Sequence, residues 1–178
     1  MRPVFLIGFM GCGKSTLGRA LSERSALGFI DLDSLIEERC GMTVSRIFAL
    51  HGEARFRAIE RQALADVAAT ENVVVACGGG TPCFFDNMSL MTRNGLTVWL
   101  EASHLTLMRR LRAAAAERPL IAGKNDAELS EFIAGSLRKR APHYSQAAAR
   151  FPSDRLETLS QIDESVRLFA ETFNISLK

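Results

Sequence analysis

The sequence predicts a three-layer α/β fold in which a five-stranded parallel sheet is flanked by helices, in a single domain over residues 1–178. Short apolar segments alternate along the chain with segments of helical periodicity, and strands that alternate with helices pair in parallel. The segments 4–7 and 73–77 are apolar without interruption, which is typical of strands covered on both faces. A chain of 178 residues can bury a full core, and no repeat or linker divides it.

The composition is that of an ordinary globular protein and limits the classes of partner. Hydrophobic residues make up 47% and charged residues 24% of the chain, and the formal net charge is +2. This charge is too small to favour nucleic acid or an anionic membrane, so we expect neither as a partner. The four cysteines have neither C-x-x-C nor zinc spacing, which favours reduced thiols in a cytoplasmic protein. The N-terminal apolar segment leads directly into a glycine-rich loop, which argues against a targeting peptide.

The segment VFLIGFMGCGKST at residues 4–16 predicts a strand, a loop and the start of a helix. Within it, the pattern G-x-x-x-x-G-K-[ST] of the phosphate-binding loop, or P-loop, is complete. Gly11 and Gly13 let successive backbone N–H groups turn toward an anion, and the following helix adds the positive end of its dipole. Lys14 is suited to the β- and γ-phosphates of a nucleotide, and the Ser15 hydroxyl is suited to Mg²⁺.

The next strand is predicted at 28–31 and ends in the carboxylate of Asp31, with Asp33 two residues further on. Because ligands bind at the carboxyl ends of parallel strands, both acids should face the phosphate-binding loop. One would hold Mg²⁺ through water and the other would hydrogen-bond an acceptor hydroxyl. The alternative is that they only begin a helix, where aspartate is favoured. Ser34 and Glu37 have the spacing of a capping box, which predicts the helix start at Ser34.

Two helices are predicted over residues 43–51 and 53–70, since apolar residues recur in both at helical spacing. Arg57 follows Phe56 on the flank of the apolar stripe in the second helix. Its guanidinium should therefore lie near the edge of the sheet rather than in open solvent.

The strand at 73–77 ends in three consecutive glycines, Gly78–Gly80. They form either a tight turn or a place where backbone amides approach a ligand closely. Thr81 and Pro82 then have the order of an N-cap and a first helical residue. Cys77 stands where a Walker B strand would end in aspartate, and the chain has no N-K-x-D motif. These absences argue against regulatory GTPases and motor ATPases.

Residues 96–100 predict another buried strand, and Ser103 caps the helix that follows, through about residue 114. The segment from about 113 to 125 is basic and is interrupted by a proline and a glycine, so we expect a mobile lid there. Arg118 in this segment is placed to close over ATP. The neighbouring arginines also fit a solvated helix face: Arg109, Arg110 and Arg112.

The C-terminal third predicts a long helix over about 127–140, a turn or short strand near Phe151, and a final helix. Arg140 falls on the apolar face of the long helix, where an arginine either extends outward to solvent or enters the cleft. Spacing alone leaves both alternatives open. In the cleft, its planar fork would suit a carboxylate or phosphate. The final helix has an apolar face made of Leu159, Ile162, Val166, Phe169 and Phe173.

Taken together, these motifs resemble those of the shikimate kinase family, which has the nucleoside-monophosphate-kinase-like P-loop fold. The resemblance covers most of the chain, and the order and spacing of the motifs make it specific. Two positions depart from the family pattern: Cys12 stands where a small residue is expected, and Phe151-Pro152 replaces a V-D-T-like strand. The motifs are G-F-M-G-C-G-K-S-T, F-I-D-L-D, G-E-A-R-F-R at 52–57, G-G-G-T at 78–81, E-R-P-L at 117–120 and R-A-P-H-Y at 140–144.

The resemblance implies that the chain phosphorylates the 3-hydroxyl of shikimate with ATP and Mg²⁺, a step of aromatic amino-acid biosynthesis. It also implies a lid over about 113–125 and acceptor-binding helices within about 31–70. The implied catalytic residues are Lys14, Asp33 and Arg118. The implied nucleotide site comprises Gly11, Cys12, Gly13, Lys14, Ser15, Thr16 and Arg118, and the magnesium site comprises Ser15 and Asp31. The implied shikimate site comprises Asp33, Arg57, Gly79, Gly80 and Arg140, with the two arginines and the two glycine amides holding the carboxylate.

Two other functions remain as alternatives. One is another small-molecule kinase of similar fold, such as a gluconate kinase, although a neutral or cationic acceptor would not need both Arg57 and Arg140. The other is a regulatory domain that has kept the P-loop but lost turnover, which would bind ATP without acceptor-dependent release of ADP. We expect the chain to be a monomer.

Overall fold

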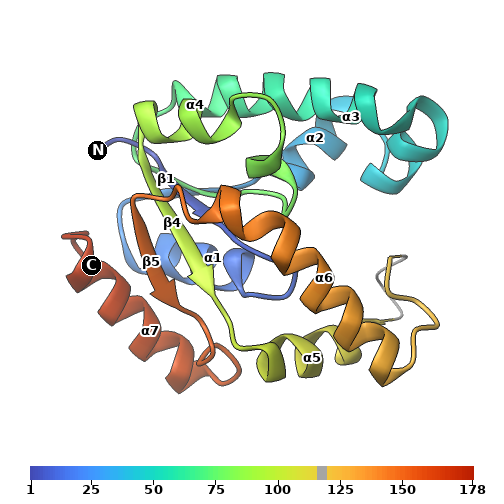
Figure 1. The fold of residues 1–178 in the computed structure, drawn as a ribbon. Helices are drawn as coiled ribbons and strands as arrows, with labels where there is room; N and C mark the ends of the chain where they lie inside the picture. Colours follow the sequence, from blue (N-terminus) through green and yellow to red (C-terminus); the bar gives the residue numbers. More distant parts are fainter. Residues whose placement is uncertain (116–119) are drawn as a thin grey trace.

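The structure is a computed structural model that describes residues 1–115 and 120–178 (Figure 1). One sheet contains five strands in the order β2-β3-β1-β4-β5, and every neighbouring pair is parallel. The predicted α/β fold with a five-stranded parallel sheet is therefore confirmed. The strands are β1 (Val4–Ile7), β2 (Gly28–Asp31), β3 (Val73–Ala76), β4 (Leu96–Glu101) and β5 (Ala149–Pro152).

The central strand β1 shows why this sheet needs helices on both faces. Val4 and Leu6 belong to one hydrophobic cluster, the first core, whereas Phe5 and Ile7 belong to another, the second core. Successive side chains of a strand point to opposite faces, and all four of these side chains are fully buried. The uninterrupted apolar run of β1 follows from this coverage on both sides.

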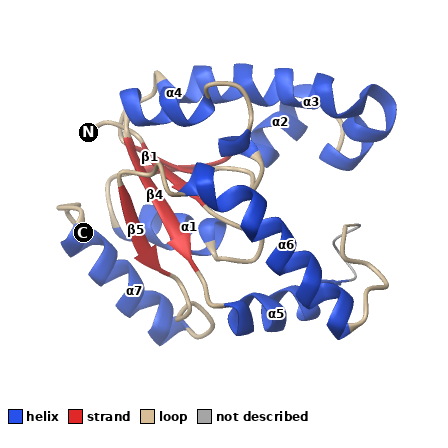
Figure 2. Ribbon diagram, in the orientation of Figure 1, coloured by secondary structure: helices blue, strands red, loops and turns tan. Residues whose placement is uncertain are grey.

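Helices from different parts of the chain cover the two faces. Figure 1 shows α3 and α4 above the sheet and α1 and α7 below it, and Figure 2 shows the strands enclosed between these helical layers. The first core contains side chains from α1 (Lys14–Arg24), α5 (His104–Ala113), α6 (Asp126–Tyr144) and α7 (Leu159–Thr172). The second core contains side chains from α2 (Leu32–Cys40), α3 (Val44–Ala68), α4 (Asn87–Asn94) and the end of α6.

The long helix α3 is interrupted at Gly52, whose backbone is non-helical with φ 75° and ψ 171°. The interruption separates the segment 44–51 from the segment 53–68. The prediction of two helices over 43–51 and 53–70 is therefore confirmed, although the two parts follow each other without an intervening loop.

The predicted start of α2 at Ser34 is wrong. Asp31 is the N-cap, because its Oδ1 accepts hydrogen bonds from the N–H groups of Asp33 and Ser34 at 3.2 and 3.3 Å. The Glu37 carboxylate does not reach back to the helix start. It accepts instead from the N–H of Val44 at 2.8 Å, at the beginning of α3.

Thr81 does not cap an α-helix either, so that prediction is also wrong. It begins a single 3₁₀ turn, η1 (Thr81–Cys83), and α4 starts only at Asn87. The Thr81 hydroxyl donates to the side chain of Glu60 at 2.5 Å, and this long-range partner replaces the local cap.

The short strand expected near Phe151 is present as β5. It lies at the edge of the sheet and pairs only with β4, where Pro152 forms the last pair, with Glu101. A proline lacks an N–H for the ladder, so an edge strand, and the end of a strand in particular, tolerates it.

The structure shows neither a disulfide bond nor a membrane-spanning helix in the residues that it describes. All four cysteines are unpaired thiols, and two of them, Cys12 and Cys77, are buried. In the two stretches that the structure describes, no helix has the length and apolar character needed to cross a membrane.

Candidate active site

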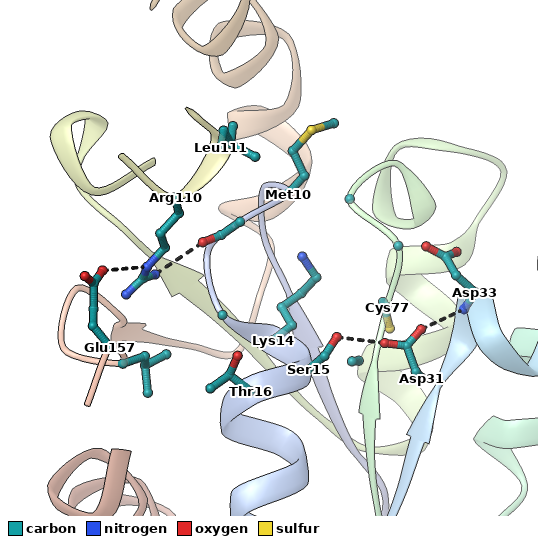
Figure 3. A pocket seen from close by; sticks show the side chains of 16 residues that line it. Met10, Lys14, Ser15, Thr16, Asp31, Asp33, Cys77, Arg110, Leu111 and Glu157 are labelled. Atoms are coloured by element: carbon teal, nitrogen blue, oxygen red, sulfur yellow. Dashed lines mark hydrogen bonds and ion pairs between the residues drawn. The ribbon is translucent and has the colours of Figure 1, made fainter. Parts of the chain in front are cut away.

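The loop between β1 and α1 surrounds a hollow at the carboxyl edge of the sheet (Figure 3). Gly13 is the N-cap of α1 with φ 97°, a left-handed conformation that favours glycine, and a Cβ there would collide with Leu156. Lys14, Ser15 and Thr16 form the first turn of α1 and line the hollow, so the positive end of the helix faces it. The predicted strand, loop and helix are confirmed.

Lys14 and Cys12 meet within this loop, where the Lys14 ammonium lies 3.7 Å from the Cys12 Sγ. The Lys14 ammonium donates to the carbonyl oxygens of Gly8 and Phe9 at 2.9 and 3.0 Å, on the side of the hollow. Cys12 is 1% exposed, belongs to the first core and does not line the hollow. Its side chain therefore packs the loop against the core.

Asp31 joins the phosphate-binding loop to α2. The Ser15 hydroxyl donates to Asp31 Oδ2 at 2.7 Å, while Asp31 Oδ1 caps α2. Asp31 thus begins α2 and also faces the phosphate-binding loop, while its role toward magnesium stays a prediction. Ser15 and Asp31 place two oxygen atoms side by side at the hollow (Figure 3).

Asp33 lies in the first turn of α2, and its carboxyl group also lines the hollow. Burial has the largest effect on its pKa, and the negative charges of Asp31 and Glu60 add to it, while Lys14 opposes the change. Together they raise the pKa of Asp33 from 3.8 to about 6. A carboxylate in this range is ionised at neutral pH and still able to take up a proton, which suits a group that receives a hydroxyl proton.

Three charged side chains from different helices meet at the three glycines after β3. A Cβ on Gly78 would lie 3.0 Å from Asp33 Oδ1, and one on Gly79 would lie 3.1 Å from Arg140 Nη1. A Cβ on Gly80 would lie 2.7 Å from Arg57 Nη2, too close for any side chain unless the arginine moved. The segment Gly78–Gly80 therefore passes one acid and two arginines in turn, without side chains of its own in between.

Arg57 is fixed at this segment by two acids on its own helix. Its Nε and Nη2 donate to Glu53 Oε1 at 3.3 and 3.1 Å, and its Nη1 donates to Glu60 Oε2 at 2.9 Å. A guanidinium has five N–H donors, so one hydrogen on each terminal nitrogen remains, and both nitrogens lie near Gly80. The side chain is 13% exposed, which confirms that it does not lie in open solvent.

Glu60 is a site residue that the motifs do not reveal. Its side chain is 1% exposed, and its two oxygens accept from Thr81 and from Arg57. A buried carboxylate is costly unless it is paired, and the bond from Thr81 ties α3 to the turn η1, which directly follows the glycine segment. An acid on the apolar face of the helix 53–70 is the signal in the sequence that would have identified it.

Arg140 turns toward the glycine segment at the edge of the cleft and does not extend outward to solvent, which decides between the two alternatives for its side chain. Its Nη1 approaches Gly79, and its Cζ lies 5.4 Å from the ring centroid of Phe9 in the phosphate-binding loop. One turn later, the Tyr144 hydroxyl donates to the Gly79 carbonyl at 2.5 Å and fixes the end of α6 to the same segment. Burial raises the pKa of Tyr144, so the phenol remains a donor.

Arg110 lies at the other end of the hollow and is not part of a solvated helix face. Its Nη1 donates to the Gly11 carbonyl at 3.2 Å, its Nη2 donates to the Ser153 carbonyl at 2.9 Å, and its Nε pairs with Glu157 at 3.1 Å. Arg109, by contrast, is exposed. Arg118 lies outside the described residues.

These side chains surround a cavity of about 520 Å³, a size typical of small-molecule sites. Of the predicted residues, those lining it are Gly11, Gly13, Lys14, Ser15, Thr16, Asp31, Asp33 and Gly79. Arg57, Gly80 and Arg140 lie next to it, beyond Gly79. Leu111, Leu156 and Glu157 line its far end without having been predicted.

A phosphate-binding loop at a sheet edge where carboxylates and arginines also gather defines the chain as a P-loop phosphotransferase that acts on a small molecule. The protein-family model described as shikimate kinase matches residues 10–170. The chain belongs to the shikimate kinase family.

Similar proteins cover nearly the whole chain. The shikimate kinase of Phocaeicola vulgatus is 50% identical over 174 residues, which are 98% of this chain and 99% of that protein. The crystal structure of shikimate kinase from Bacteroides thetaiotaomicron has a TM-score of 0.94 at 48% identity, and the match covers 97% of this chain and 98% of that one. Shikimate kinase from Acinetobacter baumannii in complex with shikimate has a TM-score of 0.81 at 26% identity, with coverage of 98% and 94%.

Proposed function

We propose that this chain transfers the γ-phosphoryl group of ATP to the 3-hydroxyl of shikimate, giving shikimate 3-phosphate and ADP, in the biosynthesis of chorismate and aromatic amino acids. The observation that carries this proposal is the segment Gly78–Gly80, along which Asp33, Arg140 and Arg57 follow each other in the order of the three glycines. An acceptor with hydroxyls at one end and a carboxylate at the other matches this order of groups. Membership of the shikimate kinase family supports the same acceptor.

ATP would bind with its phosphates in the loop and its base toward the far end of the cavity. Backbone N–H groups of Gly11–Thr16 would surround the phosphates, and Lys14 would contact the β- and γ-phosphates. Arg110 and Leu156, which line the far end, are placed to contact the base. The assignment of Arg118 as a lid arginine that balances charge on the γ-phosphoryl group rests on the family resemblance.

The residues beside the loop fit a magnesium ion. The Ser15 hydroxyl and the Asp31 carboxylate adjoin each other at the cavity, and Mg²⁺ prefers oxygen ligands, usually one or two carboxylates together with nucleotide phosphates. Outside 116–119, no three histidine, cysteine or acidic side chains are grouped as a metal site, so nucleotide oxygens would be needed to complete the ligand set. Bound there, the ion supplies positive charge to the β- and γ-phosphates.

Arg57 and Arg140, with the amides of Gly79 and Gly80, would hold the shikimate carboxylate. The remaining hydrogens on the two terminal nitrogens of Arg57 form a fork that matches the two oxygens of a carboxylate. With the carboxylate end of shikimate held there, the reacting hydroxyl at the other end would lie beside Asp33. Asp33 would orient this hydroxyl and take its proton. The γ-phosphoryl group of ATP is then transferred in line to the hydroxyl oxygen: its bond to the β-phosphate oxygen breaks and ADP leaves. Lys14 balances the charge during the transfer.

The reaction is tested by measuring ADP release from the purified protein with Mg-ATP and shikimate, gluconate, AMP or no acceptor. We expect release with shikimate only, and loss of that release when excess EDTA removes the magnesium. Turnover with gluconate would contradict the acceptor but leave the phosphate-binding loop in place. ATP binding without any acceptor-dependent release would instead indicate a regulatory nucleotide-binding domain.

The two arginines are tested by Arg57→Lys and Arg140→Lys, which keep the charge but remove the planar fork. We expect each change to raise the KM for shikimate about tenfold or more, as for the loss of a charged hydrogen bond, while the KM for ATP stays within about twofold. Arg138→Lys on the exposed side of α6, where Arg138 pairs with Glu131, is the matched control and should change neither constant. Unchanged shikimate KM in both site variants would contradict the carboxylate assignment.

A cytoplasmic location and a monomeric state stay predictions. The unpaired thiols of all four cysteines support the first, since such thiols persist in a reducing compartment. Analytical ultracentrifugation of the purified protein would test the second.

A further inference from the structure

The Arg57 guanidinium lies over the ring of Phe84. The Arg57 Cζ lies 4.0 Å from the centroid of the Phe84 ring, compared with 5.1 Å for Phe56 and 5.8 Å for Phe48. A separation of 4.0 Å is close to van der Waals contact, so Phe84 makes the closest aromatic contact with this cation. It comes from the loop between η1 and α4, whereas the other two rings belong to α3 itself.

The position of Phe84 is not explained by core packing. Phe84 is half-buried and belongs to neither the first nor the second core. The backbone conformation of the next residue is also unfavourable, because Phe85 has φ 49°. Its side chain is 68% exposed. One aromatic side chain thus faces outward in a left-handed conformation while its neighbour lies on Arg57.

The acids and the ring restrain Arg57 in different directions. Glu53 and Glu60 accept hydrogen bonds at the edges of the guanidinium and fix it within its plane. They restrain tilting of that plane less strongly, because a hydrogen bond tolerates a moderate change of angle. A ring in contact with one face opposes such tilting, and its attraction for the cation is strengthened because Arg57 is only 13% exposed.

We propose that Phe84 is a positioning residue that sets the plane of the Arg57 guanidinium, so that both terminal nitrogens point past Gly80 toward the carboxylate of the acceptor. This inference rests on the proposed function, in which Arg57 binds that carboxylate. Phe84 acts on the acceptor only through Arg57. Its effect should therefore appear in acceptor binding and not in nucleotide binding.

The test compares Phe84→Leu, which keeps an apolar side chain but loses the ring, with Phe84→Tyr, which keeps the ring. We expect Phe84→Leu to raise the KM for shikimate about five- to tenfold, the effect of losing a partly desolvated cation–π contact, and to leave kcat and the KM for ATP within about twofold. Phe84→Tyr should restore the original shikimate KM. Phe85→Asn, in the same loop and compatible with a positive φ, is the matched control and should leave all three constants unchanged.

A double-mutant cycle separates this inference from the proposed function. In an Arg57→Lys background, where no planar cation remains to be oriented, Phe84→Leu should change the shikimate KM less than about twofold. A full effect of Phe84→Leu in that background, or no effect in the original protein, would overturn the role of Phe84 while leaving Arg57 in place. An unchanged shikimate KM in the single variant Arg57→Lys would overturn the role of Arg57 in binding the carboxylate, and the inference with it. Thermal unfolding of each variant identifies any loss of activity that is due to misfolding.

Discussion

At the scale of single residues, Asp33 shows how the same environment affects both chemistry and stability. Its carboxyl group lies between the phosphate-binding loop and the glycine segment, where burial, with the negative charges of Asp31 and Glu60 added, raises its pKa to about 6. Burying this acid so near to other acids has no benefit for folding. The cost is understandable if the group works as a proton acceptor, because an ordinary carboxyl group would be a much weaker base.

The first prediction concerns activity. In the free enzyme, kcat/KM for shikimate should fall below about pH 6, as Asp33 becomes protonated. Asp33→Asn should lower kcat at pH 8 by about 100-fold or more and remove the acidic limb of the profile. The measurement is the pH dependence of initial rates for both proteins. An acidic limb that persists unchanged in the variant would assign the titration to another group.

The raised pKa of Asp33 also makes the free energy of unfolding depend on pH. Between pH 4 and 6 the folded protein binds a proton at Asp33 that the unfolded chain does not, so stability falls as the pH rises through this window and stays lower above it. Asp33→Asn removes this loss and should raise the free energy of unfolding at pH 8 by up to about 3 kcal/mol, with no gain below pH 4. Urea unfolding at both pH values measures it. Glu38→Gln on the exposed side of α2 should show no such pH-dependent gain.

At the scale of elements, the glycine segment acts as a spacer of fixed width between α3 and α6. Gly80→Ala would place a methyl group against the Arg57 guanidinium, and Arg57 would have to move away from Glu60 or from the acceptor. We expect the KM for shikimate to rise about tenfold, the cost of disturbing one charged hydrogen bond, with the KM for ATP unchanged. Steady-state kinetics with each substrate varied in turn would measure both constants.

Gly135→Ala is the matched control for this change, because a Cβ at Gly135 meets only ordinary contacts at 3.7 and 3.9 Å. Gly135 lies inside α6, where alanine is preferred to glycine by about 0.5–1 kcal/mol. The variant should therefore unfold about 1–4 °C higher and keep both KM values. An equal loss of shikimate affinity in both glycine variants would show that Gly80→Ala acts through general disturbance rather than through Arg57.

The elements also show what could be predicted from the sequence. Strands and helices with a clear apolar period were predicted correctly, and the P-loop residues were placed because their motif is contiguous. The helix starts at Ser34 and Thr81 were wrong because the deciding partners, Asp31 at a strand end and Glu60 in a distant helix, outcompete a local capping pattern. Glu60 and Phe84 escaped prediction for the same reason, since their roles depend on contacts across the fold and not on spacing.

At the scale of the whole molecule, the sheet divides the interior into two cores, which touch at Leu137 of α6. Ile133 in α6 belongs to the first core and Ile36 in α2 belongs to the second, and both are fully buried. Each change from isoleucine to valine should lower the free energy of unfolding by about 0.5–1.5 kcal/mol. Because the two sites share no cluster, their effects should add to within about 0.5 kcal/mol in the double variant. Denaturant unfolding of the three variants tests this, and a larger coupling would mean that the sheet transmits strain between its faces.

This division also affects how such an enzyme can evolve. Side chains that support the phosphate-binding loop, among them Cys12, Leu111 and Leu156, belong to the first core, whereas the helices α2 and α3, which carry the proposed acceptor residues, pack in the second. Substitutions that reshape α2 or α3 repack mainly the second core, because the sheet lies between them and the first; α6, which carries Arg140, is the helix that contacts both. Selection for a different acceptor can therefore act on one half of the molecule, while the inherited ability to bind ATP is maintained in the other half.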